Sequence, residues 1–139
     1  MAGKNVIVVD DGLKTYSIEN KSGEVLGEFR FNPSDTNIIR RYEDVAKFLN
    51  EVDLSKYPEG VDGMTQLEDD MKKQILYLLN VGKNCDLFKV AGPMTPLVSG
   101  ELYIENVMDA IKAVIEAETG ERVKKARSRA SKYTQKYHK

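Results

Sequence analysis

The sequence predicts an α+β fold in which a small antiparallel sheet precedes three helices. Residues 5–31 are rich in β-branched and aromatic residues and are divided by turn signals. Residues 38–79 and 104–115 instead place apolar residues every three or four positions, as amphipathic helices do. The chain has 139 residues, which suits one domain. We expect residues 1–120 to form it and residues 121–139 to follow as a basic tail.

Three strands are expected at the start of the chain. Residues 5–10 (NVIVVD) are apolar and β-branched, and Asp11-Gly12 follows them. An Asp-Gly pair between two strands favours a type I′ turn, because both central residues of that turn need positive φ. Residues 13–20 are then the return strand, and residues 24–31 the third strand. The prediction is a three-stranded meander that needs a helix against its apolar face.

The alternation of residues 24–31 defines that face. Val25, Phe29 and Phe31 fall on one side of the third strand, after a second turn at Lys21-Ser22-Gly23. The first helix is expected to follow at once, because Asn32 or Ser34 can accept hydrogen bonds from free helix amides and Pro33 suits a first helical position. The apolar stripe of this helix consists of Ile38, Tyr42, Val45, Leu49 and Val52.

A loop and a second helix are expected next. Residues 53–63 contain a proline and two glycines and predict the loop. Thr65 and Glu68 have the spacing of a capping box at the start of the helix, and Gly82 is a natural C-terminal stop. The apolar stripe consists of Leu67, Met71, Ile75, Leu78 and Leu79.

The remaining segments are less regular. Residues 86–90 predict a short strand or an extended stretch. The third helix begins after Ser99 or Gly100, and residues 121–139 continue it as a solvated helix or are disordered. The stripe of the third helix consists of Ile104, Val107, Met108, Ile111, Val114 and Ile115.

Charge divides the chain into two opposed parts. Residues 1–120 hold 13 Lys and Arg against 21 Asp and Glu, a net −8, and residues 121–139 hold eight basic residues against Glu121, a net +7. An acidic body with a basic tail is typical of a partner-binding protein. The expected partner-binding residues of the tail are Arg122, Lys124, Lys125, Arg127, Arg129, Lys132, Tyr133 and Tyr137.

Catalytic and metal chemistry find little support in the sequence. The single His138 lies one residue from the end of the chain, and the single Cys85 has no histidine near it in sequence, so we expect Cys85 to be structural. The carboxylates of Glu68, Asp69 and Asp70 are expected at a helix start, where negative charge is favourable. We expect no enzyme activity, no cofactor and no metal ion. No apolar run reaches membrane-spanning length, and no secretory signal is visible, so a soluble, cytoplasmic protein is expected.

One stretch resembles a known group of proteins. Residues 23–49 (GEVLGEFRFNPSDTNIIRRYEDVAKFL) carry Phe-x-Phe-Asn-Pro-x-Asp directly before an amphipathic helix. This arrangement resembles small tail-module proteins of tailed phages and prophages of Gram-positive bacteria, and among them the tail assembly chaperones. The end of the chain, with Tyr133, Thr134 and Lys136, is also similar. The resemblance implies a non-enzymatic protein that binds the helical tape measure protein and helps to recruit tail-tube subunits.

Two functions therefore remain. The first is a tail assembly chaperone that binds the tape measure protein or another tail protein, with self-association of the chain left open. The second is an accessory protein that binds nucleic acid through the basic tail, because Lys and Arg neutralise phosphates and Tyr133 and Tyr137 could stack on bases. The acidic body disfavours the second function. A tape measure gene immediately downstream would favour the first.

Overall fold

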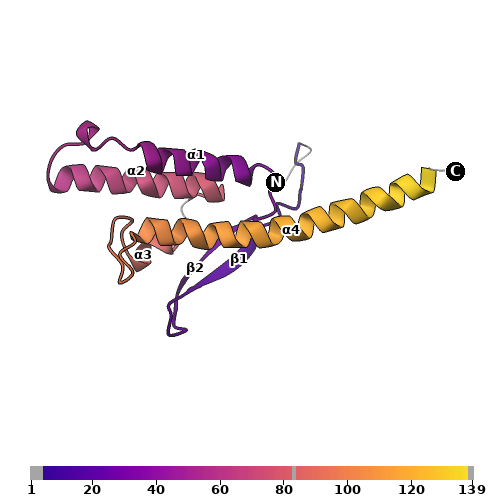
Figure 1. Ribbon diagram of the computed structural model, residues 1–139, viewed down its shortest axis with the longest axis horizontal. Coiled ribbons are helices and arrows are strands. Elements are labelled where there is room, and N and C mark those ends of the chain that lie inside the picture. Colours follow the sequence, from indigo (N-terminus) through magenta and orange to yellow (C-terminus); the bar gives the residue numbers. More distant parts are fainter. Residues whose placement is uncertain (1–4, 83, 138–139) are drawn as a thin grey trace.

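The computed structural model describes residues 5–82 and 84–137, with residues 121–137 described by their backbone. Strands and helices coexist, so the α+β class is confirmed. Figure 1 shows α1 and α2 lying side by side, α4 running along them, and the sheet crossing α4. The elements in chain order are β1 (Lys14–Glu19), β2 (Val25–Phe31), α1 (Ile38–Glu51), the 3₁₀ helix η1 (Leu54–Lys56), α2 (Val61–Leu79), α3 (Leu87–Val90) and α4 (Tyr103–Tyr137).

The three-stranded meander is a wrong prediction. In the described part of the chain the sheet has two strands, β1 and β2, paired antiparallel, and residues 5–10 are not a strand. The Asp11-Gly12 hairpin does not form because the Leu13 N–H, which would close its turn, donates to the Asp11 carboxylate at 3.0 Å. The Asp10 carboxylate likewise accepts the Gly12 N–H at 2.8 Å. These short side-chain turns send residues 5–10 away from the sheet.

The aromatic face of the sheet forms as predicted. Phe29 and Phe31 lie on one face of β2, with ring centroids 5.6 Å apart, and Tyr16 on β1 contacts both rings. Phe31 is fully buried and shares a core with Ile38 and Val45 of α1. The turn at residues 20–24 also forms, because the Asn20 side chain accepts the N–H groups of Ser22 and Glu24.

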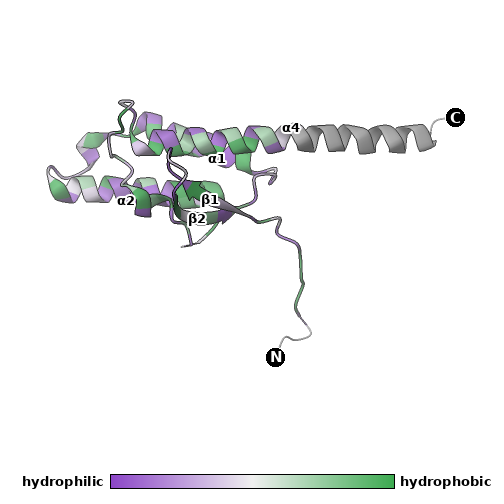
Figure 2. Cartoon of the chain, turned by 90° about the horizontal axis from the view of Figure 1, so that it is seen from below, coloured by the Kyte–Doolittle hydropathy of each residue, from purple (hydrophilic) through white to green (hydrophobic). Residues whose placement is uncertain are grey.

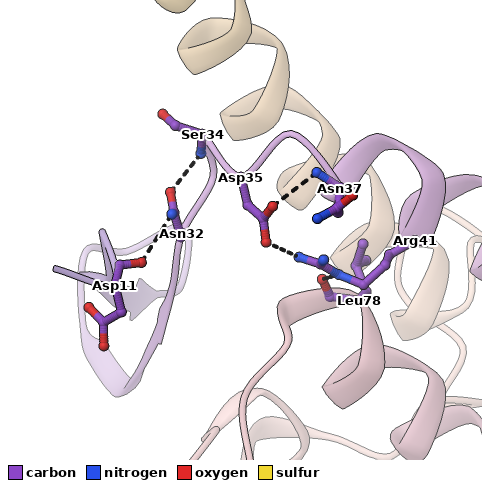
Figure 3. A network of polar contacts seen from close by, with 7 residues as sticks. All are labelled: Asp11, Asn32, Ser34, Asp35, Asn37, Arg41 and Leu78. Carbon is purple, nitrogen blue, oxygen red and sulfur yellow. Dashed lines mark hydrogen bonds and ion pairs between the residues drawn. The ribbon is translucent and has the colours of Figure 1, made fainter. Parts of the chain in front are cut away.

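The junction between β2 and α1 differs from its prediction. Asn32 and Ser34 do not cap the helix, since α1 begins at Ile38 with Asn37 at the N-cap position and no capping side chain. The Asn32 carboxamide oxygen instead accepts the Ser34 N–H at 3.0 Å, and the Asp35 carboxylate accepts the Asn37 N–H at 2.9 Å (Figure 3). The polar residues of this segment therefore form two consecutive turns ahead of the helix.

A buried arginine joins this junction to the helices. Only 8% of Arg41 is exposed. Its Nε donates to the Leu78 carbonyl near the end of α2 at 3.0 Å, and its Nη2 forms an ion pair with Asp35 at 3.0 Å (Figure 3). The guanidinium thus ties the loop before α1 and the last turn of α2 to α1 itself.

The boundaries of α2 also correct the sequence analysis. The helix begins at Val61, and Thr65 lies inside it, where its hydroxyl donates to the Val61 carbonyl rather than forming a capping box. Gly63 belongs to the first turn of the helix instead of the loop. Glycine is needed there, because a Cβ would lie 1.5 Å from the Pro58 carbonyl oxygen. The helix ends at Leu79, before the predicted stop at Gly82. Asn80, with φ of 54°, takes the left-handed conformation that a glycine usually adopts at a helix end.

The later segments contain more helix than expected. Residues 87–90 form the single-turn helix α3 instead of a strand, so the described part of the chain holds more than the three predicted helices. The α4 backbone continues through the basic segment as far as Tyr137. The predicted stripes of the long helices do form the core, which contains Phe31, Ile38, Val45, Leu67, Met71, Ile75, Leu78, Leu79, Leu87, Tyr103, Ile104, Val107, Met108, Ile111 and Ile115.

Replacement of Arg41 tests its role. We expect Arg41→Met to lower the free energy of unfolding by about 3 kcal/mol, because Asp35 and the Leu78 carbonyl lose a buried charged donor. The matched control is Arg40→Met, since Arg40 is the neighbouring, exposed arginine, and its effect should stay within about 0.5 kcal/mol. Urea denaturation of both variants measures the difference. Equal midpoints for the two variants would contradict the role given to Arg41.

Candidate protein-binding groove

A groove of about 590 Å³ lies between the sheet, α4 and the loop that precedes α4. Its floor carries the aromatic face of the sheet, and one wall is the apolar side of α4. The loop contributes Leu97 and Val98, and Val98 is fully exposed at the rim. The principal apolar residues of the groove are Tyr16, Ile18, Leu26, Phe29, Phe31, Leu97, Val98, Tyr103, Val107, Ala110, Ile111 and Val114.

The groove has the character of a binding surface for apolar side chains. Phe29 and Ile18 are only half-buried, and Leu26 is exposed, so part of the sheet face remains in contact with water. Figure 2 shows hydrophobic residues over this sheet. Concave, largely apolar surfaces with a polar rim are common sites for ligands and for segments of other proteins.

An ion pair ties β1 to α4 beside the groove. The Lys14 ammonium donates to the Glu118 carboxylate at 2.9 Å. This hydrogen bond raises the pKa of Lys14 above its ordinary value. The contact joins the start of β1 to the middle of α4 and so helps to set the spacing between the sheet and the helix.

The outer edge of β2 is held by the segment before α3. Cys85 forms an isolated β-bridge with Phe29. The Asp86 N–H donates to the Glu28 carbonyl at 3.2 Å, and the Asp86 carboxylate accepts the Glu28 N–H at 3.0 Å. The hydrogen bond from the Glu28 N–H lowers the pKa of Asp86, and Lys89 adds to this effect. Gly27 is needed here, because a Cβ at that position would lie 2.6 Å from the Asp86 Cβ.

Cys85 therefore has a structural setting. It is half-buried against the core, and burial raises the pKa of its thiol. A raised thiol pKa reduces the thiolate fraction on which nucleophilic reactivity depends. Lys83 lies outside the described residues, and Lys89 pairs with Asp86 rather than with the thiol.

The acidic residues of α2 hold loops in place. Because α2 begins at Val61, Glu68 and Asp70 do not lie at the helix start where they were predicted. The Glu68 carboxylate accepts the Met94 N–H at 3.0 Å, and Asp70 accepts the Tyr57 hydroxyl at 2.6 Å, which raises the pKa of Tyr57. Within the described part of the chain, no group of three or more His, Cys, Asp or Glu residues could hold a metal ion.

The predicted partner-binding residues lie in the C-terminal part of α4. The structure describes the residues from Arg122 to Tyr137 by their helical backbone alone. Figure 1 shows this part of α4 extending beyond the sheet and beyond α1 and α2. The basic residues are thus carried on one helix that also forms a wall of the groove.

Sequence reasoning did not find the groove. It predicted the aromatic face of β2 and the apolar stripe of α4 as separate features, and it expected a helix against the apolar face of the sheet. The open part of the groove lies on the sheet, where Ile18 and Phe29 are only half-buried and Leu26 is exposed.

Comparison with protein-family models, with curated proteins and with solved structures finds no match for this chain. Among the described residues, no helix combines the length and the apolar character that crossing a membrane requires.

Proposed function

We propose that this chain is a non-enzymatic, cytoplasmic protein that binds a partner protein, and that it acts as a tail assembly chaperone of a phage or prophage. The partner is the tape measure protein, and one of its apolar segments lies in the groove between the sheet and α4. The observation that carries the proposal is this groove, about 590 Å³ in volume and lined chiefly by apolar side chains.

The resemblance of residues 23–49 supports the choice of partner. Phe29 and Phe31 of the shared motif both line the groove, so the motif contributes directly to the proposed binding surface. Asn32 and Asp35 of the same motif form the turns that lead into α1. The motif therefore connects the aromatic floor of the groove to the turns that lead into α1.

The shape of the groove fits a segment with regularly spaced apolar side chains. An amphipathic helix places such residues on one face, and the tape measure protein is expected to be helix-rich. The basic residues from Arg122 to Lys136 lie on the helix that forms one wall, so they can add attraction to acidic residues of the partner. Met71 and Met108 lie in the core and take no part in this surface.

A charge placed in the groove tests the binding site. Ala110 is exposed and lines the groove, so Ala110→Glu should leave folding intact and weaken binding of the tape measure protein about tenfold by placing an unpaired charge against apolar groups. Binding is measured by titration calorimetry, or by co-purification after co-expression with the tape measure protein encoded by the neighbouring gene.

The matched control for this variant lies one turn further along α4. Ala113 is also exposed and is not part of the groove lining, so Ala113→Glu should bind the tape measure protein as the unchanged chain does. Equal loss of binding in both variants, or no loss in either, would contradict the groove as the site.

Removal of residues 121–139 separates the chaperone function from the alternative, nucleic-acid binding. All buried core residues that the structure describes precede residue 116, so the truncated chain should keep its unfolding free energy within about 0.5 kcal/mol. Its affinity for the tape measure protein should fall most at low salt, where charge attraction is least screened.

The nucleic-acid alternative predicts another pattern. The full chain would bind DNA with a steep dependence on salt, the truncated chain would lose this binding, and neither would co-purify with the tape measure protein. That combination of results would replace the chaperone proposal with the accessory role.

A further inference from the structure

Residues 5–10 form an arm that is exposed on all sides. Val6, Ile7, Val8 and Val9 are four consecutive β-branched apolar residues, and Ile7 and Val8 are 87% and 90% exposed. Figure 2 shows this arm leaving the body of the protein and pointing away from it. A run of this kind has the composition of a strand and, as it stands, leaves most of its apolar surface exposed.

The sheet offers an open edge that matches this arm. β2 is flanked by β1 on one side and by Cys85 and Asp86 on the other. β1, in contrast, pairs with no strand other than β2 in the described part of the chain. The groove runs along β1, with residues 16–21 in its lining. An open strand edge beside an apolar groove is the geometry that accepts an added strand.

We propose that the arm of one copy adds as an antiparallel strand to β1 of a second copy. The arm cannot readily reach β1 of its own chain, because the turn that would fold it back is held open. The Asp11 carboxylate binds the Leu13 N–H, and the Asn32 carboxamide binds the Asp11 carbonyl at 3.1 Å (Figure 3). The strand that the sequence encodes is therefore exchanged between copies, as in domain swapping.

Length and charge support one register. The arm and β1 are each six residues long. Pairing residue 10 of the arm with residue 14 places Val8 beside Tyr16 and Val6 beside Ile18. Both pairs lie on the face of the sheet that lines the groove. The same register places Asp10 beside Lys14 of the second copy. The Lys14 side chain is 54% exposed, and one of the three N–H groups of its ammonium is used on Glu118, so it can also bind a carboxylate.

This inference does not rest on the proposed function, because self-association is measured without a client. A chain that self-associates but ignores the tape measure protein would leave the arm exchange standing and refute only the chaperone role.

Analytical ultracentrifugation of the purified full chain tests the exchange. We expect the unchanged chain to sediment at twice the 15.7 kDa of one chain or more. Val8→Asp and Ile7→Pro should each weaken this association at least tenfold. The first places a charge in the groove, and the second removes an N–H that faces β1, because Ile7 lies opposite Ser17, whose backbone groups point to the open edge of β1. Circular dichroism should stay unchanged, because Ile7 and Val8 are exposed in the single chain.

The matched control is Val61→Asp, since Val61 is 81% exposed and begins α2 away from the sheet. This variant should associate as the unchanged chain does. A monomeric unchanged chain, or full association of both the Val8→Asp and the Ile7→Pro variants, would overturn the proposal.

A cross-link tests the register directly. The proposed pairing sets Ile7 opposite Ser17, both exposed and at a separation that a disulfide can bridge. In a Cys85→Ala background, chains with Ile7→Cys and chains with Ser17→Cys are mixed and oxidised, and a disulfide-linked pair of the two is expected. Chains with Val61→Cys replace those with Ile7→Cys in the control. Equal yields in the two mixtures would refute arm exchange.

Discussion

The buried Arg41 guanidinium is the contact on which the arrangement of this protein depends. It lies where three segments meet, the loop that leaves β2, the first turns of α1 and the last turn of α2. A buried charge of this kind is stable only when its hydrogen bonds are satisfied, so the three segments must keep a fixed relation. Since α4 packs against α1, this relation also sets where α4 lies over the sheet.

The groove follows from this arrangement. The Lys14–Glu118 ion pair holds β1 and α4 together at one place. Val107 and Ile111 of the α4 wall are buried, whereas Ile18, Leu26 and Phe29 of the sheet stay partly open to solvent. The fold therefore supplies an apolar binding face next to an open strand edge, and both the proposed client and the proposed arm exchange use it.

The sequence predicted the parts of the fold that depend on periodic burial. Ile38, Val45 and Ile75 occupy the core because a helical stripe reports burial directly. Local signals were less reliable. The predicted capping box at Thr65 does not form, because α2 begins earlier, at Val61. The absence of a side chain at Gly63 lets this first turn lie against the Pro58 carbonyl.

The third strand and the groove could not be predicted for a different reason. Whether residues 5–10 pair depends on the hydrogen bonds of Asp11 and Asn32, residues separated in the chain and joined only by the tertiary structure. The groove depends on how far one surface covers another, which no pattern within a single helix or strand reports. The basic residues of the tail were visible as a charge run, whereas the helical backbone of residues 121–137 was one of two structures that the sequence left open.

Hydrogen–deuterium exchange of the chain, free and bound to the tape measure protein, tests the central claim that the groove is a docking site for a protein. The account predicts slower exchange on binding at the backbone amides of β1 and at residues 106–114 of α4, with little change along α1 and α2. Slower exchange confined to residues 121–137, or no change at β1, would contradict it.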